Sequence, residues 1–315
     1  TFGCRAHILF AASTFLKEWQ ISTDLFPSQD LPQIPLFSAS GTCSADTPYT
    51  FNPAMTNIQA RCEAKNFPLS LCKKMLIFSP QLFEPLEAFL GETLYATADC
   101  ALSRGQGTVV MHLDSTSTSA NFIGAIEEGG VVLKEPLKIS TTLSPQLITW
   151  ASRQYGSFFS RIDPSSHRIT LQIDPQNSRF PLWGDEIFAI QVGAGVLHLD
   201  PFSLRNQDGA LSNFITPFDK GLVAVWCTPI YFSIHDHVLQ MQRWDCQFAG
   251  KYTLAGWGQV KLPPLQGNLT LGLHPDILQA VFHLSTKKNY LFQIPVKVHG
   301  GEVQINKTKV LARIG

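Results

Sequence analysis

The sequence predicts an all-β protein made of antiparallel jelly-roll β-sandwich domains, with a few short helices in the loops. Three observations support this prediction. Short segments alternate apolar and polar residues with a period of two, which is typical of strands with one buried face. Glycine and proline interrupt these segments where turns are needed. Segments with helical spacing are few.

The last third of the chain carries the clearest alternation. Breakers such as Pro263-Pro264, Gly267 and Gly300-Gly301 separate its segments, as expected for turns between antiparallel strands. The strands expected here are 222–226, 231–241, 252–262, 268–273, 290–298 and 302–310.

The middle third repeats this pattern, with a polar loop, Asp114 to Ser119, between its first two segments. Strands at this spacing are typical of a sandwich or a jelly roll. The strands expected here are 108–112, 121–126, 168–173, 186–192 and 196–199.

Helical spacing is clearest from Pro80 to Leu90, where apolar residues share one face and Gly91 marks the end. Glu84 and Glu87 fall on the opposite face. Two further segments, Ser144 to Tyr155 and Pro275 to Phe282, are also expected to form short helices.

The first ninety residues are interrupted by prolines and are interpreted as an irregular arm or a partial β unit. Residues 7–10, 58–62 and 75–78 are its expected strands. Aromatic residues are enriched at protein contacts, and this segment offers little regular structure to bury them. They are therefore predicted to lie on another protein surface: Phe26, Phe37, Tyr49, Phe51 and Phe67. The expected organisation is 1–90 as the irregular arm or partial β unit, 91–228 as a jelly roll, and 229–315 as a further antiparallel unit. Two alternatives stay open for 1–90, which either completes the unit at 229–315 or docks on a neighbouring molecule.

Composition argues against several function classes. Lys plus Arg and Asp plus Glu number 24 each, so no global field attracts nucleic acid or a charged membrane. The longest apolar run near the start, His7 to Leu16, is too short to span a bilayer. The seven cysteines form an odd set without C-x-x-C spacing, and are predicted to be buried free thiols in a reducing compartment.

His235 and His237 are the first residues to consider for a metal site. Two residues apart on one strand, they point to the same face and can share a metal. The cupin family begins its metal site in this way, but it adds a glutamate a few residues on, and 238–242 contains none. The prediction is therefore no metal and no cofactor.

No arrangement for covalent catalysis is evident either. There is no G-x-S-x-G elbow, and Gly105-Gln106-Gly107 and Gly193-Ala194-Gly195 lack the third glycine of a phosphate-binding loop, so they are interpreted as turns. The acidic pair Asp185-Glu186 and the doublets Lys73-Lys74 and Lys287-Lys288 are interpreted as solvated ends of strands. The chain is therefore not expected to be an enzyme.

Residues from about Gly91 to Trp226 resemble a jelly-roll domain of picorna-like virus capsids, closest to those of comoviruses and nepoviruses. The block Gly105-Gln-Gly-Thr-Val-Val-Met-His-Leu113, followed by 117–124, resembles the first two strands. Ser144-Pro-Gln-Leu-Ile-Thr-Trp150 resembles the next strand region. Arg168-Ile-Thr-Leu-Gln-Ile-Asp-Pro175 resembles a central strand, and Glu186-Ile-Phe-Ala-Ile-Gln-Val-Gly-Ala-Gly195 resembles the one after it.

The resemblance implies a structural subunit, released from a polyprotein, that self-assembles in many copies into an icosahedral shell around RNA. Its partners would be copies of itself and other capsid subunits, with weak contacts to RNA and no membrane span. Its location would be the virion, assembled in the host cytoplasm. No catalytic residues follow from it.

Two alternatives stay open. The first is a carbohydrate- or ligand-binding β-sandwich of the lectin or adhesin kind, in which Trp244 or Trp257 would line the binding site. The second is an enzyme on a jelly-roll scaffold that uses a metal held by His235 and His237.

Overall fold

The structure, a computed structural model, describes residues 3–10, 18–26, 36–45, 56–70, 80–127, 130–155, 159–164, 167–181, 190–205, 221–250, 252–261, 266–277, 291–299 and 302–305. The chain divides into two compact units. Unit 1 comprises Thr1–Thr141 with Ile173–Ile187, and unit 2 comprises Thr142–Gln172 with Phe188–Gly315.

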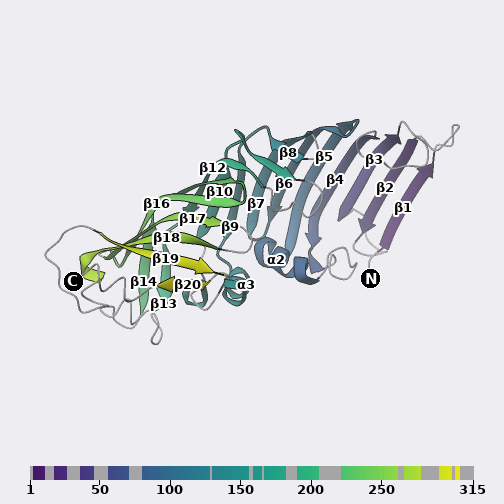
Figure 1. Ribbon diagram of the computed structural model, residues 1–315. Coiled ribbons are helices and arrows are strands. Elements are labelled where there is room, and N and C mark those ends of the chain that lie inside the picture. Colours follow the sequence, from purple (N-terminus) through teal and green to yellow (C-terminus); the bar gives the residue numbers. More distant parts are fainter. Residues whose placement is uncertain are drawn as a thin grey trace. The chain divides into compact units, whose positions relative to one another are not determined.

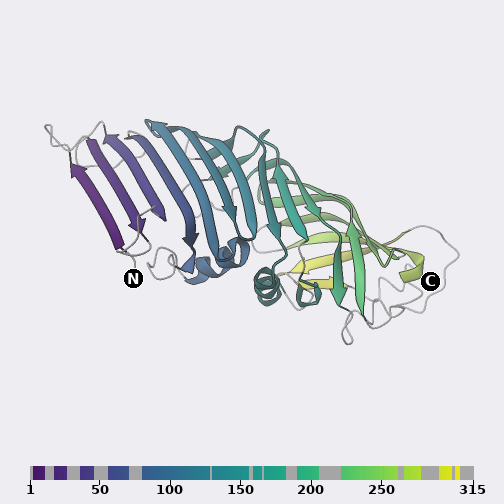
Figure 2. The same ribbon diagram turned by 180° about the vertical axis from the view of Figure 1, so that it is seen from behind.

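Unit 1 is built on an antiparallel meander in which β1 to β7 pair in the order of the sequence. Figure 1 shows these strands side by side, from purple to teal, and Figure 2 shows the same order from behind. Their bounds are β1 Gly3–Phe10, β2 Glu18–Phe26, β3 Phe37–Ala45, β4 Thr56–Pro68, β5 Thr93–Ser103, β6 Gln106–Ser115 and β7 Thr118–Glu127.

Tight turns set the register of the later hairpins. Arg104 and Gly105 join β5 to β6 with positive φ at both residues (51° and 72°), the geometry of the turn that follows the natural twist of a hairpin. Thr116 and Ser117 join β6 to β7, so the loop predicted at Asp114 to Ser119 is only a two-residue turn.

In the part of unit 1 that the structure describes, three shorter strands and helix α2 accompany the meander. β8 (Gly130–Leu133) pairs with both β7 and β11 (Arg179–Pro181), while β9 (Leu137–Thr142) pairs with β7. Helix α2 spans Pro80–Leu90, as the apolar spacing predicted. It ends where the Gly91 amide donates to the Glu87 carbonyl (2.8 Å) with φ at 79°, which is a common glycine stop.

Unit 2 holds helix α3 and the remaining strands. Its core lies under β18 and β19, where buried Leu273, Ile277, Phe292, Ile294 and Val296 pack together. The elements are α3 Pro145–Tyr155, the 3-10 turn η2 Phe159–Arg161, β10 Arg168–Ile173, β12 Val192–Leu199, β13 Phe202–Arg205, β14 Leu222–Cys227, β15 Ile230–His235, β16 Val238–Phe248, β17 Tyr252–Lys261, β18 Gln266–Leu273, β19 Phe292–His299 and β20 Glu302–Ile305.

Strands β15 to β20 of unit 2 also pair antiparallel in sequence order. β14 pairs with the far half of β16, which bulges between Met241 and Trp244. This pairing places Cys227 of β14 directly opposite Cys246 of β16.

Cys227 and Cys246 form a disulfide, with their Cα atoms 4.2 Å apart. The prediction that all seven cysteines are free thiols is therefore wrong for this pair. Sequence spacing does not reveal the pairing because 19 positions and one intervening strand separate the two residues. Cys43, Cys62 and Cys100 are free and only half-buried.

The antiparallel all-β class with few short helices is confirmed. The sequential pairing of β1 to β7 is that of a meander, and the finer jelly-roll arrangement stays a prediction. The described part of the first ninety residues contains four long strands, which agrees with a partial β unit and not with an irregular arm. The two compact units divide the chain at other positions than residues 90 and 228.

Helix α3 at Pro145–Tyr155 confirms the short helix predicted for Ser144 to Tyr155, whereas the strand region that the family resemblance implied at 144–150 is wrong. The Leu147 amide donates a hydrogen bond to the Ser144 side-chain oxygen, with 3.1 Å between the nitrogen and the oxygen. Pro145 stands at the first helical position. Both features favour the start of a helix. The part of 275–282 that the structure describes, 275–277, is also helical.

Across the described ranges, none of the helices has the length and apolar character that crossing a membrane requires.

Candidate assembly interface

The meander of unit 1 has one apolar face because its strands alternate apolar and polar residues. β3 begins the pattern, since Phe37, Ala39, Gly41 and Cys43 alternate with serine and threonine. In a strand successive side chains point to opposite sides, so these four residues share one face of the sheet.

The antiparallel register carries this face across four strands. Ala39 pairs with Cys62, Cys62 with Ala98, and Ala98 with Met111. Paired residues point to the same side of a sheet. The residues two positions before and after each of these also point to that side. The resulting surface, called here the apolar face, consists of Ala39, Gly41, Cys43, Ile58, Ala60, Cys62, Ala98, Cys100, Leu102, Val109, Met111 and Leu113.

The opposite face of the same strands is polar. Arg61 and Asp99 pair in the register and form an ion pair there, with the Arg61 Nε 3.8 Å from the carboxylate. Such exposed pairs contribute little stability, and their role here is to keep this face in water. The other polar-face residues on these strands include Ser38, Ser40, Thr42, Gln59, Glu63, Thr97, Thr108, His112 and Asp114.

Every residue of the apolar face is only half-buried. The ribbons of β2, β3 and β4 stand in open view in both Figure 1 and Figure 2, without a second layer of unit 1 elements over them. A sheet with one apolar side normally packs that side against another layer. Over β3 and β4, no other described element of unit 1 provides such a layer for the apolar face.

The three free thiols that the structure describes, Cys43, Cys62 and Cys100, belong to this surface. Burial raises the pKa of Cys43 above its ordinary value. Burial also raises the pKa of Cys100, and the neighbouring Cys62 adds to the effect. Neutral, half-buried thiols act as small apolar groups, in keeping with the residues around them.

Beside the apolar face, the row formed by Phe37, Ala64 and Ala96 is covered by the chain itself. Buried Ala64, Phe67 and Leu69 form a cluster there with Phe37, Leu90 and neighbouring apolar residues. The Phe37 and Phe67 rings meet edge to face, with centroids 6.1 Å apart and planes at 61°.

Of the five aromatic residues predicted to lie on another protein surface, two pack within this chain instead. Phe37 is half-buried and Phe67 is buried, each against the other, and they belong to a local core. Phe26 is the last residue of β2, while Tyr49 and Phe51 lie outside the described residues. Sequence reasoning instead missed the small residues of β3, although their strict alternation with serine and threonine was the available signal.

His235 and His237 do not share a strand. His235 ends β15, and Asp236 and His237 form the turn to β16 with φ of 48° and 63°. The assumption that both imidazoles point to one face is therefore wrong. Among the described residues there is no group of three or more metal-ligating side chains.

The remaining sequence motifs carry no site in the described structure. Gly193-Ala194-Gly195 lies within β12 instead of at a turn, and the Phe232 ring packs over Gly195. Asp185-Glu186, Lys73-Lys74 and Lys287-Lys288 fall outside the described residues. Trp244 packs over Gly256, where an added Cβ would come within 2.5 Å of the indole, and Trp257 faces the other way.

Comparison of the chain with family models, curated proteins and solved structures found no significant match.

Proposed function

We propose that this chain is a structural subunit that assembles with further copies of itself through the apolar face, as the coat protein of an icosahedral RNA virus. The observation that carries the proposal is a sheet with one continuous apolar face that the described part of unit 1 leaves half-exposed. Monomeric proteins rarely expose contiguous apolar patches beyond a few hundred Å².

The size of the sheet suits a stable interface. The strands β3 to β6, which carry the apolar face, are each at least nine residues long. At about 4.8 Å between strands and about 3.4 Å per residue they cover roughly 600 Å². Two such surfaces packed face to face would bury about 1,200 Å², which is at the lower end of the range of specific, stable protein interfaces.

The distribution of side-chain sizes favours a second copy as the occupant. On β3 and β4 the apolar face is lined by alanine, glycine and cysteine with one larger residue, Ile58, and on β6 by Val109, Met111 and Leu113. Related by a two-fold axis, the large residues of each copy would lie over the small residues of the other. Self-complementarity of this kind is what a symmetric interface requires.

A viral shell is the assembly that best accounts for the sequence as well. The balanced charges and the low charged fraction of 15% suit a subunit whose surface is largely covered by neighbours. The resemblance of residues 91–226 to picorna-like capsid domains points the same way. In this proposal the subunit is located in virions assembled in the host cytoplasm, beside other capsid subunits, and it contacts RNA only weakly.

The first experiment is to measure particle size by light scattering and negative-stain microscopy. Uniform shells tens of nanometres across are the expected result. A monodisperse monomer at high protein concentration would exclude the proposal.

A matched pair of variants then tests the interface itself. Val109 lies on the apolar face and Val110 on the polar face of the same strand, and both are half-buried. Val109→Lys places an unpaired charge in the proposed contact, which costs roughly 3 kcal/mol or more. We expect the concentration needed for assembly to rise at least about 100-fold.

Val110→Lys is the control, because it adds the same charge to the same strand on the face that stays in water. Circular dichroism and thermal unfolding of the two unassembled variants verify that both are folded. Equal assembly of the two variants would show that the apolar face is not the interface.

A further inference from the structure

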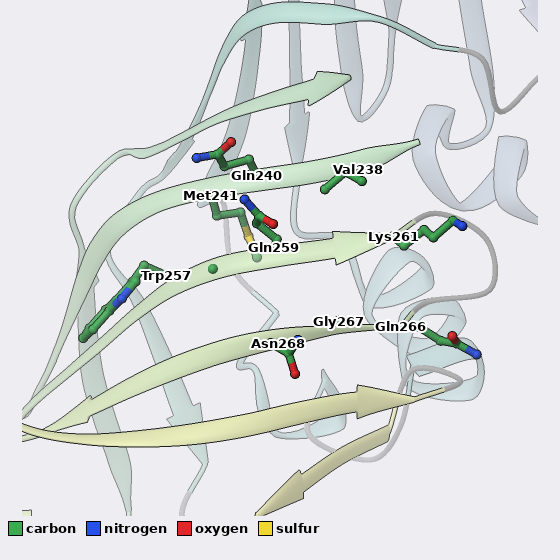
Figure 3. A pocket seen from close by; sticks show the side chains of 10 residues that line it. Val238, Gln240, Met241, Trp257, Gln259, Lys261, Gln266, Gly267 and Asn268 are labelled. Carbon is green, nitrogen blue, oxygen red and sulfur yellow. The ribbon is translucent and has the colours of Figure 1, made fainter. Parts of the chain in front are cut away.

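A groove runs over the sheet of unit 2, far along the sequence from the apolar face. It has a volume of about 490 Å³ and lies across β16, β17 and β18. Figure 3 shows Trp257 at one end and Lys261 with Gln266 at the other, with Gln240 and Gln259 between them. The groove therefore joins an aromatic end to a cationic end through a polar middle.

The middle of the groove is a row of three side-chain amides. Gln240 pairs with Gln259, and Gln259 pairs with Asn268, so the three stand on neighbouring strands on one side of the sheet. All three are exposed. Each amide offers two N–H donors and one carbonyl acceptor, and neighbouring side chains in such a row lie about 5 Å apart.

The aromatic end is held in place by the backbone beneath it. A Cβ built on Gly272 would come within 3.3 Å of the Trp257 ring, so the ring reaches over this glycine. Trp257 is half-exposed and supplies an apolar surface with an N–H donor.

Charge at the other end is positive. Of the described residues that line the groove, Lys261 alone is ionisable, and it is exposed. The register places Lys297, also exposed, beside Asn268 on the next strand. Within this described lining there is no carboxylate.

We propose that this groove binds an acidic saccharide, a sugar that carries a carboxylate. The row of amides matches hydroxyl groups that both donate and accept hydrogen bonds. Trp257 packs against the apolar C–H side of a sugar ring, and Lys261 pairs with the carboxylate. The inference does not rest on the proposed assembly, because it uses a different unit and different residues.

The experiment uses the full chain and three probes: trigalacturonic acid, 3′-sialyllactose and the uncharged sugar lactose. Binding is measured by isothermal titration calorimetry. We expect at least one of the two acidic saccharides to bind. Lactose should bind at least about tenfold more weakly than the acidic saccharide that binds, or not at all.

Two variants locate the site. Lys261→Met keeps the aliphatic stem and removes the charge, and it should weaken binding of the acidic probe about tenfold or more. Trp257→Ala should also weaken it. Lys138→Met on β9 and Trp226→Ala on β14 are matched controls, because Lys138 is exposed and Trp226 is 48% exposed and neither lines the groove.

The proposal is overturned if neither acidic saccharide binds, if lactose binds as tightly as the acidic saccharide that binds, or if Lys261→Met binds as the unsubstituted chain does. Light scattering of the same variants separates the two proposals. A variant that loses saccharide binding but keeps its particle size shows that the groove is not needed for assembly.

Discussion

Gly267 lies where β18 runs close to β17, and a Cβ built on it would come within 2.1 Å of the Gln259 carbonyl oxygen. Gly267→Ala must therefore push backbone apart, and overpacking of this kind costs about 1–3 kcal/mol. The free energy of unfolding, measured in urea, should fall by that amount. Gly221→Ala is the control, since nothing lies within 4 Å of its added Cβ. Equal losses in both variants would contradict the structure.

The thiols of the apolar face give a second test at the scale of residues. Burial raises the pKa of Cys43 and of Cys100, so at neutral pH a smaller share of each is the reactive thiolate. In the unassembled chain both should react with iodoacetamide more slowly than glutathione does, and their rates should climb as the pH rises. Peptide mass spectrometry reports each site. Alkylation of Cys43 as fast as glutathione at neutral pH would refute this.

Individual residues also show where reading the sequence succeeds and where it does not. The alternation of residues 108–112 and 222–226 is visible because valine, leucine and tryptophan stand out from their neighbours. In β3 the alternation is as regular, but alanine, glycine and cysteine differ little in hydrophobicity from serine and threonine. The strand was therefore overlooked, and with it the apolar face. The groove was only partly foreseen, through Trp257.

At the scale of elements, local signals predicted local structure. Helix α2 follows from its apolar spacing and its glycine stop. The segment 231–241 was expected as one strand, yet it is a hairpin whose turn is Asp236-His237. The polar residues of the turn fit the alternation by chance, and positive φ is uncommon enough outside glycine and asparagine that the turn gave no clear signal.

The link between β14 and β16 supports a prediction about stability. The disulfide of Cys227 and Cys246 closes a loop of 19 positions, and closing a loop of that length stabilises a protein by about 3 kcal/mol. Replacing both cysteines by alanine should lower the free energy of unfolding by about that amount in urea titrations. Cys62→Ala is the control, because Cys62 is a free thiol. Recovery of free Cys227 and Cys246 from the unreduced protein would show that the bond does not form.

At the scale of the whole molecule, the sequence indicated the all-β class but not the pairing of its strands. Alternation shows which residues share a face of one strand, and it does not say which strand lies beside it. The apolar face appears only when the registers of β3 to β6 are combined. Likewise the two units each include segments distant in sequence, so division by composition alone placed the boundaries elsewhere.

Assembly through the apolar face predicts how the protein responds to salt. The face contains no charged residue, so screening has no attraction to weaken across it. Raising NaCl from about 0.05 M to about 1 M, which shortens the screening length to about 3 Å, should leave the assembled fraction unchanged or raise it. Sedimentation velocity measures that fraction. Dissociation at high salt would mean that charged surfaces hold the copies together and that the apolar face has another role. Binding of an acidic saccharide to the groove depends on Lys261 and should weaken over the same range, so a single salt series separates the two surfaces, because only saccharide binding is weakened by salt.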